Sequence, residues 1–500
     1  MKFYVADRFA NPPRKSKETQ VVLQRDNWDD FGFKTYFDVN LYRTNDDVIK
    51  LGAVKILRAG QTGGQTEFEQ KSFVSLDDRY CSLGQDIEYY EKLSALPEKE
   101  RTEFLRSIRD AATDEKIASA FEDEPGWRTS LLRFGQAEHT LSAAKSLFDG
   151  TKPSEGVASF THRSSNPHSE MSFDFDDSGP LPGRCKALIG YNGVGKTRLL
   201  ADLARATSKV GEKLESSLGN GSLAFSAVIA VSYSAFDTFE LPPVGKIGDN
   251  TFTGNDNSPL NTYFGYTYCG LRRLQNGQAS RQLKSISEID EELTIAFCLA
   301  CNRDTTSLKE AFNDIGRDPS FGRAGLDLSD WIDRKELPEG NLGKLSAGQK
   351  IVINIVVQLA AHLRTRSLVL IDEPETHLHP PLLAALLRGT QHLLNSFDSF
   401  AIIATHSPVV LQEVPAKDVQ VIERFGDEIR TINPRLETFG AGLGELTKEA
   451  FGLDNTVADY RAVIRELASN RSLDEVESLF PLGLSSQARA LVLRALRESR

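Results

Sequence analysis

Residues 190–197 read Gly-Tyr-Asn-Gly-Val-Gly-Lys-Thr, and this stretch decides the fold. It fits the pattern G-x-x-x-x-G-K-[ST] without a mismatch, it follows an apolar segment at 184–189, and a helical pattern begins at Thr197. In such a loop the glycines let backbone N–H groups turn inward around phosphate oxygens, and the helix N-terminus adds its positive dipole end. The plain alternative is a glycine-rich turn with a chance Lys-Thr pair, and the strand-loop-helix context argues against it.

Two carboxylates end a second apolar segment, Leu-Val-Leu-Ile-Asp-Glu at 368–373. A parallel sheet places its chemistry at the carboxyl ends of its strands. We expect Lys196 to reach the β- and γ-phosphates of ATP and Thr197 to coordinate Mg²⁺. We expect Asp372 to hold the same Mg²⁺, directly or through water, and Glu373 to polarise the attacking water. The alternative is a strand followed by an acidic surface turn.

Two further segments complete the predicted site. Leu-Ser-Ala-Gly-Gln-Lys at 345–350 precedes an apolar helical run, so Ser346 and the Gly348 backbone could hold a γ-phosphate, although Ser346 could equally be a plain N-cap. His406 follows the apolar strand at 400–404 and could contact the γ-phosphate, although a lone histidine is more often structural. The predicted catalytic residues are Lys196, Glu373 and His406, the predicted metal ligands are Thr197 and Asp372, and the predicted ATP-contacting residues are Gly190, Asn192, Gly193, Val194, Gly195, Lys196, Thr197, Arg198, Ser346, Gly348 and Gln349.

These segments, in this order, resemble the ABC ATPase family over about residues 184–410. GYNGVGKT is similar to its Walker A motif, LSAGQK to its signature, LVLIDEP to its Walker B strand with the catalytic glutamate, and IIATHSP to its switch-histidine segment. The resemblance implies a dimer with two sandwiched nucleotides, in which Ser346 acts on the ATP of the partner and the other motif residues act within their own chain.

The resemblance departs from transporters at Pro-Glu-Thr-His-Leu-His-Pro, residues 374–380, which is similar to ATPases of the overcoming-lysogenisation-defect and related bacterial defence classes. His377 and His379 could be metal ligands, but we prefer dimer-interface and helix-entry roles. The Q-loop glutamine is missing, and Ser234 or Asp237 stands in its place. The nearest classes are the ATPases of Septu and retron-associated Septu-like systems, paired with an HNH nuclease, and the PARIS-type ATPase, paired with a TOPRIM nuclease.

The composition argues against several other classes of protein. The 500 residues carry a net charge of -11, which argues against a sequence-blind nucleic-acid coat. The five scattered cysteines exclude a disulfide framework, and for the pair Cys298 and Cys301 we prefer two small buried residues on one helix face to a metal or redox site. An N-terminus without an apolar core and the lack of an apolar run of about 18 residues lead us to expect a cytoplasmic protein with no membrane contact.

The expected fold is α/β: an ABC-type P-loop NTPase head with an N-terminal antiparallel β lobe and helical insertions. We see no internal repeat and no long coiled coil. The expected divisions are an N-terminal β lobe at 1–75, a helical insertion at 76–150, the P-loop core at 151–240, a helical signature subdomain at 241–344, the Walker B and switch core at 345–430, and a helical tail at 431–500.

The leading hypothesis is an ATPase subunit of an anti-phage system, a homodimer or higher oligomer that uses ATP and Mg²⁺ to control a separate effector such as an HNH or TOPRIM nuclease. The alternative is a DNA-repair or recombination ATPase that clamps nucleic acid, with Arg272, Arg273, Arg281 and Lys284 as a candidate basic stripe. A third reading is a scaffold that binds ATP with little turnover, and the intact Glu373 argues against it.

Overall fold

The computed structural model divides the chain into two compact units, Met1–Gly440 and Ala441–Arg500. It describes residues 1–7, 19–27, 29–43, 48–133, 157–165, 168–191, 193–208, 225–234, 262–263, 266–275, 278–325, 327–337, 343, 345–426, 428–451 and 459–498, together with single positions at 137, 140, 141, 144, 147 and 148.

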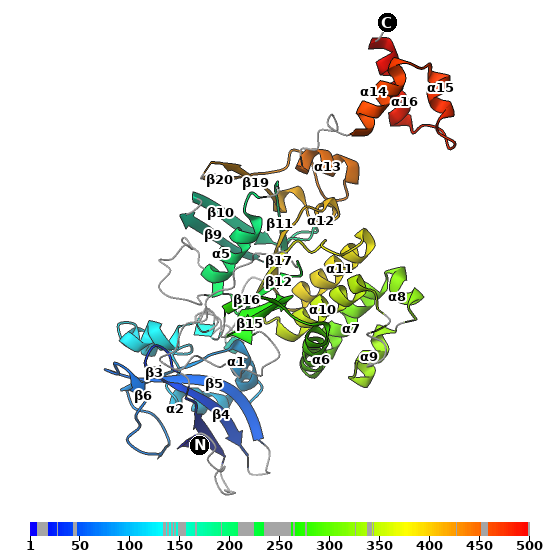
Figure 1. Ribbon diagram of the computed structural model, residues 1–500. Coiled ribbons are helices and arrows are strands. Elements are labelled where there is room, and N and C mark those ends of the chain that lie inside the picture. The colour runs from blue at the N-terminus through cyan, green and yellow to red at the C-terminus, as the bar shows by residue number, and fades with distance from the viewer. Residues whose placement is uncertain are drawn as a thin grey trace. The chain divides into compact units, whose positions relative to one another are not determined.

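A ten-stranded sheet forms the centre of the first unit (Figure 1). Its middle is parallel, and the β9–β10 and β19–β20 hairpins add antiparallel pairs at one side. The strands, in their order across the sheet, are β13 (Thr262–Tyr263), β14 (Tyr266–Gly270), β12 (Val228–Ser232), β17 (Leu368–Asp372), β18 (Phe400–Ala404), β11 (Cys185–Ile189), β19 (Val419–Phe425), β20 (Glu428–Ile432), β10 (His168–Asp176) and β9 (Val157–Ser165).

Apolar side chains cover both faces of the parallel strands. In β17, Leu368 and Leu370 belong to the core beneath α5 (Lys196–Ser208), while Val369 and Ile371 belong to the core on the opposite face. Strands buried on both sides read as continuous apolar runs, which explains the LVLI segment. The opposite face carries α6 (Ile286–Arg303), α7 (Thr305–Gly316), α8 (Pro319–Arg323), α9 (Leu328–Arg334), α10 (Ala347–His362) and α11 (Pro380–Ser396) (Figure 1).

An N-terminal lobe has its own sheet and core. Its strand order is β7 (Ser72–Phe73), β1 (Lys2–Ala6), β2 (Gln20–Arg25), β4 (Tyr36–Tyr42), β5 (Val48–Arg58) and β8 (Tyr80–Gly84), with β1 and β2 parallel and the other pairs antiparallel. Its other elements are the paired β3 (Phe33–Lys34) and β6 (Gly64–Gln65), the helices α1 (Ile87–Ser94), α2 (Glu98–Ser107) and α3 (Glu115–Phe121), and a π-helical turn at Trp127–Leu131.

The helical segment after residue 75 packs as part of this lobe. β8 completes the lobe's sheet beside β5, and Tyr89, Phe104 and Phe121 lie in the same apolar core as the strands. From the sequence we expected a separate insertion at 76–150. Helical periodicity shows that a helix has an apolar face, but it does not show which sheet that face covers.

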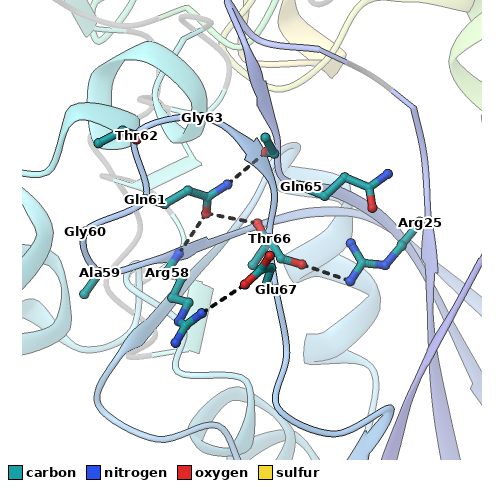
Figure 2. Close-up of a pocket in the computed structure, with 11 residues that line it drawn as sticks. Arg25, Arg58, Ala59, Gly60, Gln61, Thr62, Gly63, Gln65, Thr66 and Glu67 are labelled. Atoms are coloured by element: carbon teal, nitrogen blue, oxygen red, sulfur yellow. Dashed lines mark hydrogen bonds and ion pairs between the residues drawn. The ribbon is translucent and has the colours of Figure 1, made fainter.

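A polar hollow of about 500 Å³ lies beside the glycine-containing loop at 59–67 of the lobe (Figure 2). The groups around it already bond one another. Gln61 Nε2 donates to Gly64 O at 3.0 Å, and Arg25 Nη2 donates to Thr66 O at 2.9 Å. Arg58 Nη1 lies 3.5 Å from Glu67 Oε2. We therefore interpret these contacts as holding the loop closed.

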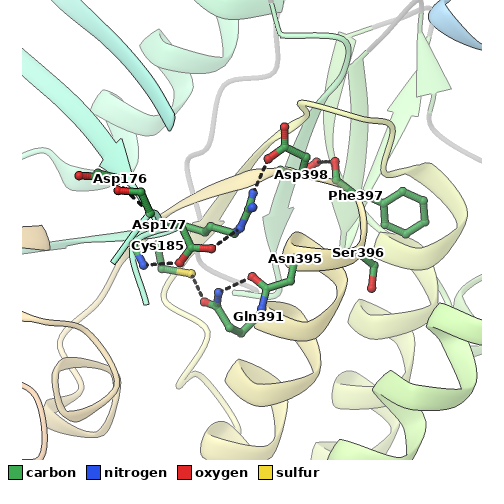
Figure 3. Close-up of polar contacts among 12 residues, drawn as sticks. Asp176, Asp177, Cys185, Gln391, Asn395, Ser396, Phe397 and Asp398 are labelled. Atoms are coloured by element: carbon green, nitrogen blue, oxygen red, sulfur yellow. Dashed lines mark hydrogen bonds and ion pairs between the residues drawn. The ribbon is translucent and has the colours of Figure 1, made fainter. Parts of the chain in front are cut away.

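A polar cluster fixes the beginning of β11, the strand that leads into the glycine loop (Figure 3). Arg184 Nε lies 2.8 Å from Asp177 Oδ2, and its Nη1 lies 2.7 Å from Asp398 Oδ1. Further along β11, Lys186 Nζ lies 2.5 Å from Asp418 Oδ1. Removing one partner of such a buried pair leaves an uncompensated charge, so these contacts hold the strand in place.

The remaining elements of the first unit are the β15–β16 hairpin (Arg272–Gln275 and Gln278–Leu283), α12 (Pro408–Gln412) and a 3₁₀ turn at Ala416–Asp418. The second unit contains α13 (Leu443–Phe451), α14 (Asp459–Ser469), α15 (Leu473–Ser478) and α16 (Ser486–Glu498), and Ile464, Ala468, Val476 and Val492 form its core. The sequence placed the start of the tail at residue 431, inside β20, which in the structure still pairs with β19.

The α/β fold predicted from the sequence is confirmed. The apolar segments at 184–189, 368–371 and 400–404 form β11, β17 and β18. Phe173 and Phe175 lie in β10, and both rings are buried. In the part of the chain that the structure describes, none of the helices is both long and apolar enough to cross a membrane.

Candidate functional site

The glycine loop connects β11 to α5 in a shape that requires glycine. A Cβ at position 190 would meet Ile422 O at 2.6 Å, so a side chain there would displace the neighbouring strand. Gly195 has a φ of +103°, a region that L side chains rarely adopt. α5 begins directly after this turn, at Lys196, so its N-terminal N–H groups lie at the loop.

The ammonium of Lys196 lies inside this loop. Its Nζ lies 3.1 Å from Gly190 O, 3.5 Å from Tyr191 O and 2.6 Å from His406 Nε2. Burial lowers the pKa of Lys196, whereas Glu373, Asp372 and Glu375 raise it. The side chain is therefore a nearly buried cation surrounded by carboxylates, a position that suits a phosphate contact.

Asp372 and Glu373 end β17 beside the first turn of α5. Thr197 Oγ1 donates to Asp372 Oδ1 at 3.2 Å, which brings a hydroxyl and a carboxylate oxygen together. Glu373 has a φ of +46°, and its N–H donates to Ala404 O at 2.8 Å. A non-glycine residue in this region costs on the order of 1 kcal/mol, so the surroundings must hold Glu373 there.

His406 follows β18 and faces both Lys196 and Glu373. Its Nε2 lies 3.4 Å from Glu373 Oε1. The hydrogen bond with His406 holds the pKa of Glu373 below its ordinary value, and the charge of Lys196 acts in the same direction, against the effect of burial. Glu373 is therefore held as a carboxylate, the form that accepts a proton or a hydrogen bond from water.

Glu375 belongs to the same cluster, and the sequence analysis gave it no role. Its Oε2 accepts from Thr405 Oγ1 at 2.9 Å, and its Oε1 accepts from the His406 N–H at 2.5 Å. Burial raises its pKa, and the hydrogen bonds from the loop act against that effect. A signal was present in the sequence, because Glu375 is the third carboxylate in Asp-Glu-Pro-Glu after a buried strand.

The predicted signature residues lie at the N-terminus of another helix, α10. Ser346 is its N-cap: its Oγ accepts from Gln349 N at 3.2 Å, and the Gln349 side chain accepts from Ser346 N at 2.9 Å. Gly348 packs closely, since a Cβ there would meet Leu382 Cδ1 at 3.0 Å. Gln349 is buried, whereas Ser346 and Ala347 are exposed. The N-terminus of α10 is thus capped by its own residues, and its first two positions are exposed to solvent.

The structure therefore brings Lys196, Thr197, Asp372, Glu373 and His406 together at the carboxyl ends of three adjacent strands. Among the other predicted residues, Val194 is buried and Arg198 is exposed. Gly193 has a φ of +83° within the loop. Asn192 and the Q-loop candidate Asp237 lie outside the described residues, and the alternative Ser234 follows the end of β12.

Two of the residues expected in a basic stripe have carboxylate partners. Arg273 Nη2 lies 2.6 Å from Glu288 Oε2, and Lys284 Nζ lies 2.7 Å from Glu292 Oε2. Arg272 stands at the start of β15, and the side chain of Arg281 lies outside the described residues. The side chains of Arg273 and Lys284 are thus both paired with carboxylates of the same chain.

The expectation that Cys298 and Cys301 share one buried helix face is wrong, because Cys301 lies in the core and Cys298 is exposed. Three residues of an α-helix rotate a side chain by about 300°, enough at a core boundary to separate the two environments. Within the described residues, no group of three or more His, Cys, Asp and Glu side chains could hold a metal ion by itself.

The donors at the glycine loop fit Mg²⁺ with a nucleoside triphosphate. Mg²⁺ is usually held by one or two protein oxygens together with waters and phosphates, and Thr197 Oγ1 and Asp372 Oδ1 lie side by side. The N-terminus of α5 and one ammonium lie at the loop. Fold and site together define an ABC-type P-loop NTPase.

The chain belongs to the family of protein ea59 from Escherichia phage lambda. The two are 30% identical over 511 aligned positions, which cover 93% of this chain and 92% of that protein. The family described as "AAA domain, putative AbiEii toxin, Type IV TA system" matches residues 253–412, which hold the signature, Walker B and switch segments. The "Retron Vc95 probable ATPase" of Vibrio cholerae serotype O1 biovar El Tor is 30% identical over 146 residues, 27% of each chain.

The similarity to solved structures is low. UvrA2 from Deinococcus radiodurans matches with a TM-score of 0.27 and 17% identity, over 56% of this chain and 38% of that one. The assignment of the chain to the ABC-type P-loop fold rests on the strand order and the site geometry.

Proposed function

We propose that this protein binds and hydrolyses ATP, and that it acts as a homodimer or higher oligomer controlling a separate effector in defence against phage. The observation that carries the ATPase part is the meeting of Lys196, Thr197, Asp372, Glu373 and His406 at the ends of β11, β17 and β18. Charge stabilisation and positioning are what phosphoryl transfer asks of a protein.

Each residue has a proposed task. Lys196 and the loop N–H groups bind the β- and γ-phosphates, while Thr197 and Asp372 hold Mg²⁺. Mg²⁺, when bound, neutralises charge on the phosphate oxygens. Glu373 accepts a hydrogen bond from the attacking water and orients it in line, and its lowered pKa keeps it ionised for this. His406 contacts the γ-phosphate from the opposite loop.

The exposed start of α10 supports the dimer. Ser346 and Ala347 face outward at a helix N-terminus, where the dipole and unpaired N–H groups favour an anion. The next two residues face inward, since Gln349 bonds Ser320 of α8 and Gly348 packs against the 377–382 segment. A phosphate held by the glycine loop of a second copy is the proposed ligand of the exposed terminus.

The relatives support the defence role. One similar protein is named as a retron ATPase, and the matching family description names a toxin of a toxin–antitoxin system. One relative comes from a phage, Escherichia phage lambda, and this fits a module that one phage carries against others. An HNH or TOPRIM nuclease is the proposed effector. The nucleic-acid clamp is less favoured, because Arg273 and Lys284 are paired with carboxylates.

The test compares three purified proteins: wild type, Lys196→Ala and Glu373→Gln. We expect Lys196→Ala to lose nucleotide affinity by at least about tenfold, since it removes a charged phosphate contact. We expect Glu373→Gln to bind ATP normally and to hydrolyse it at least about 100-fold more slowly, since it removes only a transition-state interaction. Phosphate release and equilibrium nucleotide binding measure the two effects.

Lys309→Ala is the control, because Lys309 forms an exposed ion pair with Asp333 and is not part of the phosphate site. Equal turnover by wild type and Glu373→Gln would contradict the role given to Glu373. A wild type that binds no ATP would end the ATPase proposal, and turnover that needs DNA would favour the clamp.

A further inference from the structure

Two separate loops carry the groups that face the phosphate site. Glu373 stands after β17 and His406 stands after β18, and these strands are parallel neighbours with Asp372 opposite Ala404. The sheet ladder ends at this point, where the Glu373 N–H donates to Ala404 O at 2.8 Å. Beyond it, side chains must set the distance between the two loops.

The carboxylate of Glu375 makes this connection. One oxygen accepts from the His406 N–H at 2.5 Å, and the other accepts from Thr405 Oγ1 at 2.9 Å. Thr405 is itself buried, and its Oγ1 also accepts from Ser407 N at 2.9 Å. The Glu375 side chain thus connects the loop after β17 to three consecutive residues of the loop after β18. It bonds Thr405 and His406 directly and reaches Ser407 through the Thr405 hydroxyl.

The geometry separates Glu375 from the reacting groups. Its two oxygens bond Thr405 and His406 rather than the glycine loop, whereas His406 Nε2 reaches Lys196 and Glu373. Bonds from N–H and O–H groups to a carboxylate are stronger than neutral ones, and a short contact restricts the backbone most. Burial raises the pKa of Glu375, and the hydrogen bonds that its carboxylate accepts act against this effect and stabilise the ionised form.

We propose that Glu375 is a positioning residue that locks the His406 loop to the loop of Glu373, and so sets the turnover rate through His406. This inference rests on the ATPase function proposed above. It predicts that loss of Glu375 lowers kcat and leaves ATP affinity nearly intact, since the carboxylate of Glu375 bonds Thr405 and His406 rather than the glycine loop.

The experiment is a double-mutant cycle on the full-length protein. We expect Glu375→Ala to lower kcat by about 10- to 100-fold with less than about a threefold change in ATP affinity. His406→Ala is expected to lower kcat to a similar extent. The double variant is expected to be no slower than His406→Ala alone, because residues that act through one another are not additive.

Two conservative variants keep the test open if Glu375→Ala does not fold. Glu375→Gln retains one acceptor oxygen for the His406 N–H and should recover turnover to within about fivefold of wild type. Thr405→Val removes the contact with Glu375 Oε2 together with the one from Ser407 N, keeps the His406 contact, and should give an intermediate kcat.

The matched control is Asp304→Ala. Asp304 also accepts from two backbone N–H groups, those of Thr306 and Ser307, but it caps α7. Its loss should lower thermal stability and leave kcat unchanged. Additive effects of Glu375→Ala and His406→Ala, or wild-type kcat in Glu375→Ala, would overturn the positioning role. A wild type without ATP turnover would instead refute the underlying function.

Discussion

At the scale of single residues, one nitrogen atom of His406 contacts both the ammonium of Lys196 and the carboxylate of Glu373. His406 Nε2 lies 2.6 Å from Lys196 Nζ and 3.4 Å from Glu373 Oε1. A neutral imidazole nitrogen accepts from the ammonium, whereas a protonated one donates to the carboxylate, so it cannot do both at once. The contact with Lys196 Nζ is the shorter of the two. A γ-phosphate then competes with His406 for the same ammonium.

This competition gives the prediction for His406→Ala. The variant should keep or slightly improve ATP affinity, because Lys196 loses a competing partner, while kcat should fall by about 10- to 100-fold because a transition-state contact is lost. Nucleotide binding and turnover measured on the same preparation separate the two effects. A large loss of affinity with unchanged kcat would mean that His406 only binds substrate.

The sequence predicted Lys196, Thr197, Asp372, Glu373 and His406 because each follows an apolar strand at a defined place in a motif. Their proximity is now a structural fact, and their catalytic tasks stay a prediction. Glu375 was not predicted, because its partners lie about 30 residues away and no local pattern marks a hydrogen bond across two loops. Ser346 is the N-cap of α10 and is exposed, and its contact with a phosphate stays a prediction.

At the scale of elements, β11 must stay fixed for the glycine loop to keep its shape. The cluster at its start joins Arg184 to Asp177 and Asp398, and Arg366 Nη1 lies 3.5 Å from the other oxygen of Asp398. Arg184 is 7% exposed, so its removal takes a buried cation away from both carboxylates. The parallel strands themselves were predictable from continuous apolar runs. Their order in the sheet was not, because strand pairing is set by contacts far apart in the sequence.

We therefore predict that Arg184→Ala lowers the free energy of unfolding by about 3 kcal/mol, since it breaks a buried ion pair by removing one partner. Arg163→Ala is the control, because the pair of Arg163 with Glu170 is exposed on both sides and its loss should be near 0 to 1 kcal/mol. Urea unfolding followed by circular dichroism measures both. Equal destabilisation by the two substitutions would contradict the anchoring role of Arg184.

At the scale of the whole molecule, the sequence predicted the α/β head but divided the chain differently from the structure. The described residues between 76 and 148 share the core of the N-terminal lobe, because their apolar faces cover that lobe's sheet. The second unit begins at Ala441, after β20 has joined the large sheet. Apolar periodicity shows that a helix has a buried face, but the surface that it meets is decided by the rest of the chain.

The most direct measurement of the central claim, a composite ATP site shared by two copies, is a mixing experiment. Lys196→Ala removes the phosphate contact of one copy. Ala347→Glu puts a negative charge at the exposed start of α10, where it suits the helix dipole and repels a partner's phosphate. Each variant alone should be inactive.

Mixed in equal amounts, the two variants should regain about one quarter of the wild-type rate per chain, because random pairing makes half of the dimers mixed and each holds one intact composite site. Full activity of Ala347→Glu alone, or a mixture as inactive as its parts although both variants fold and pair, would contradict the shared site.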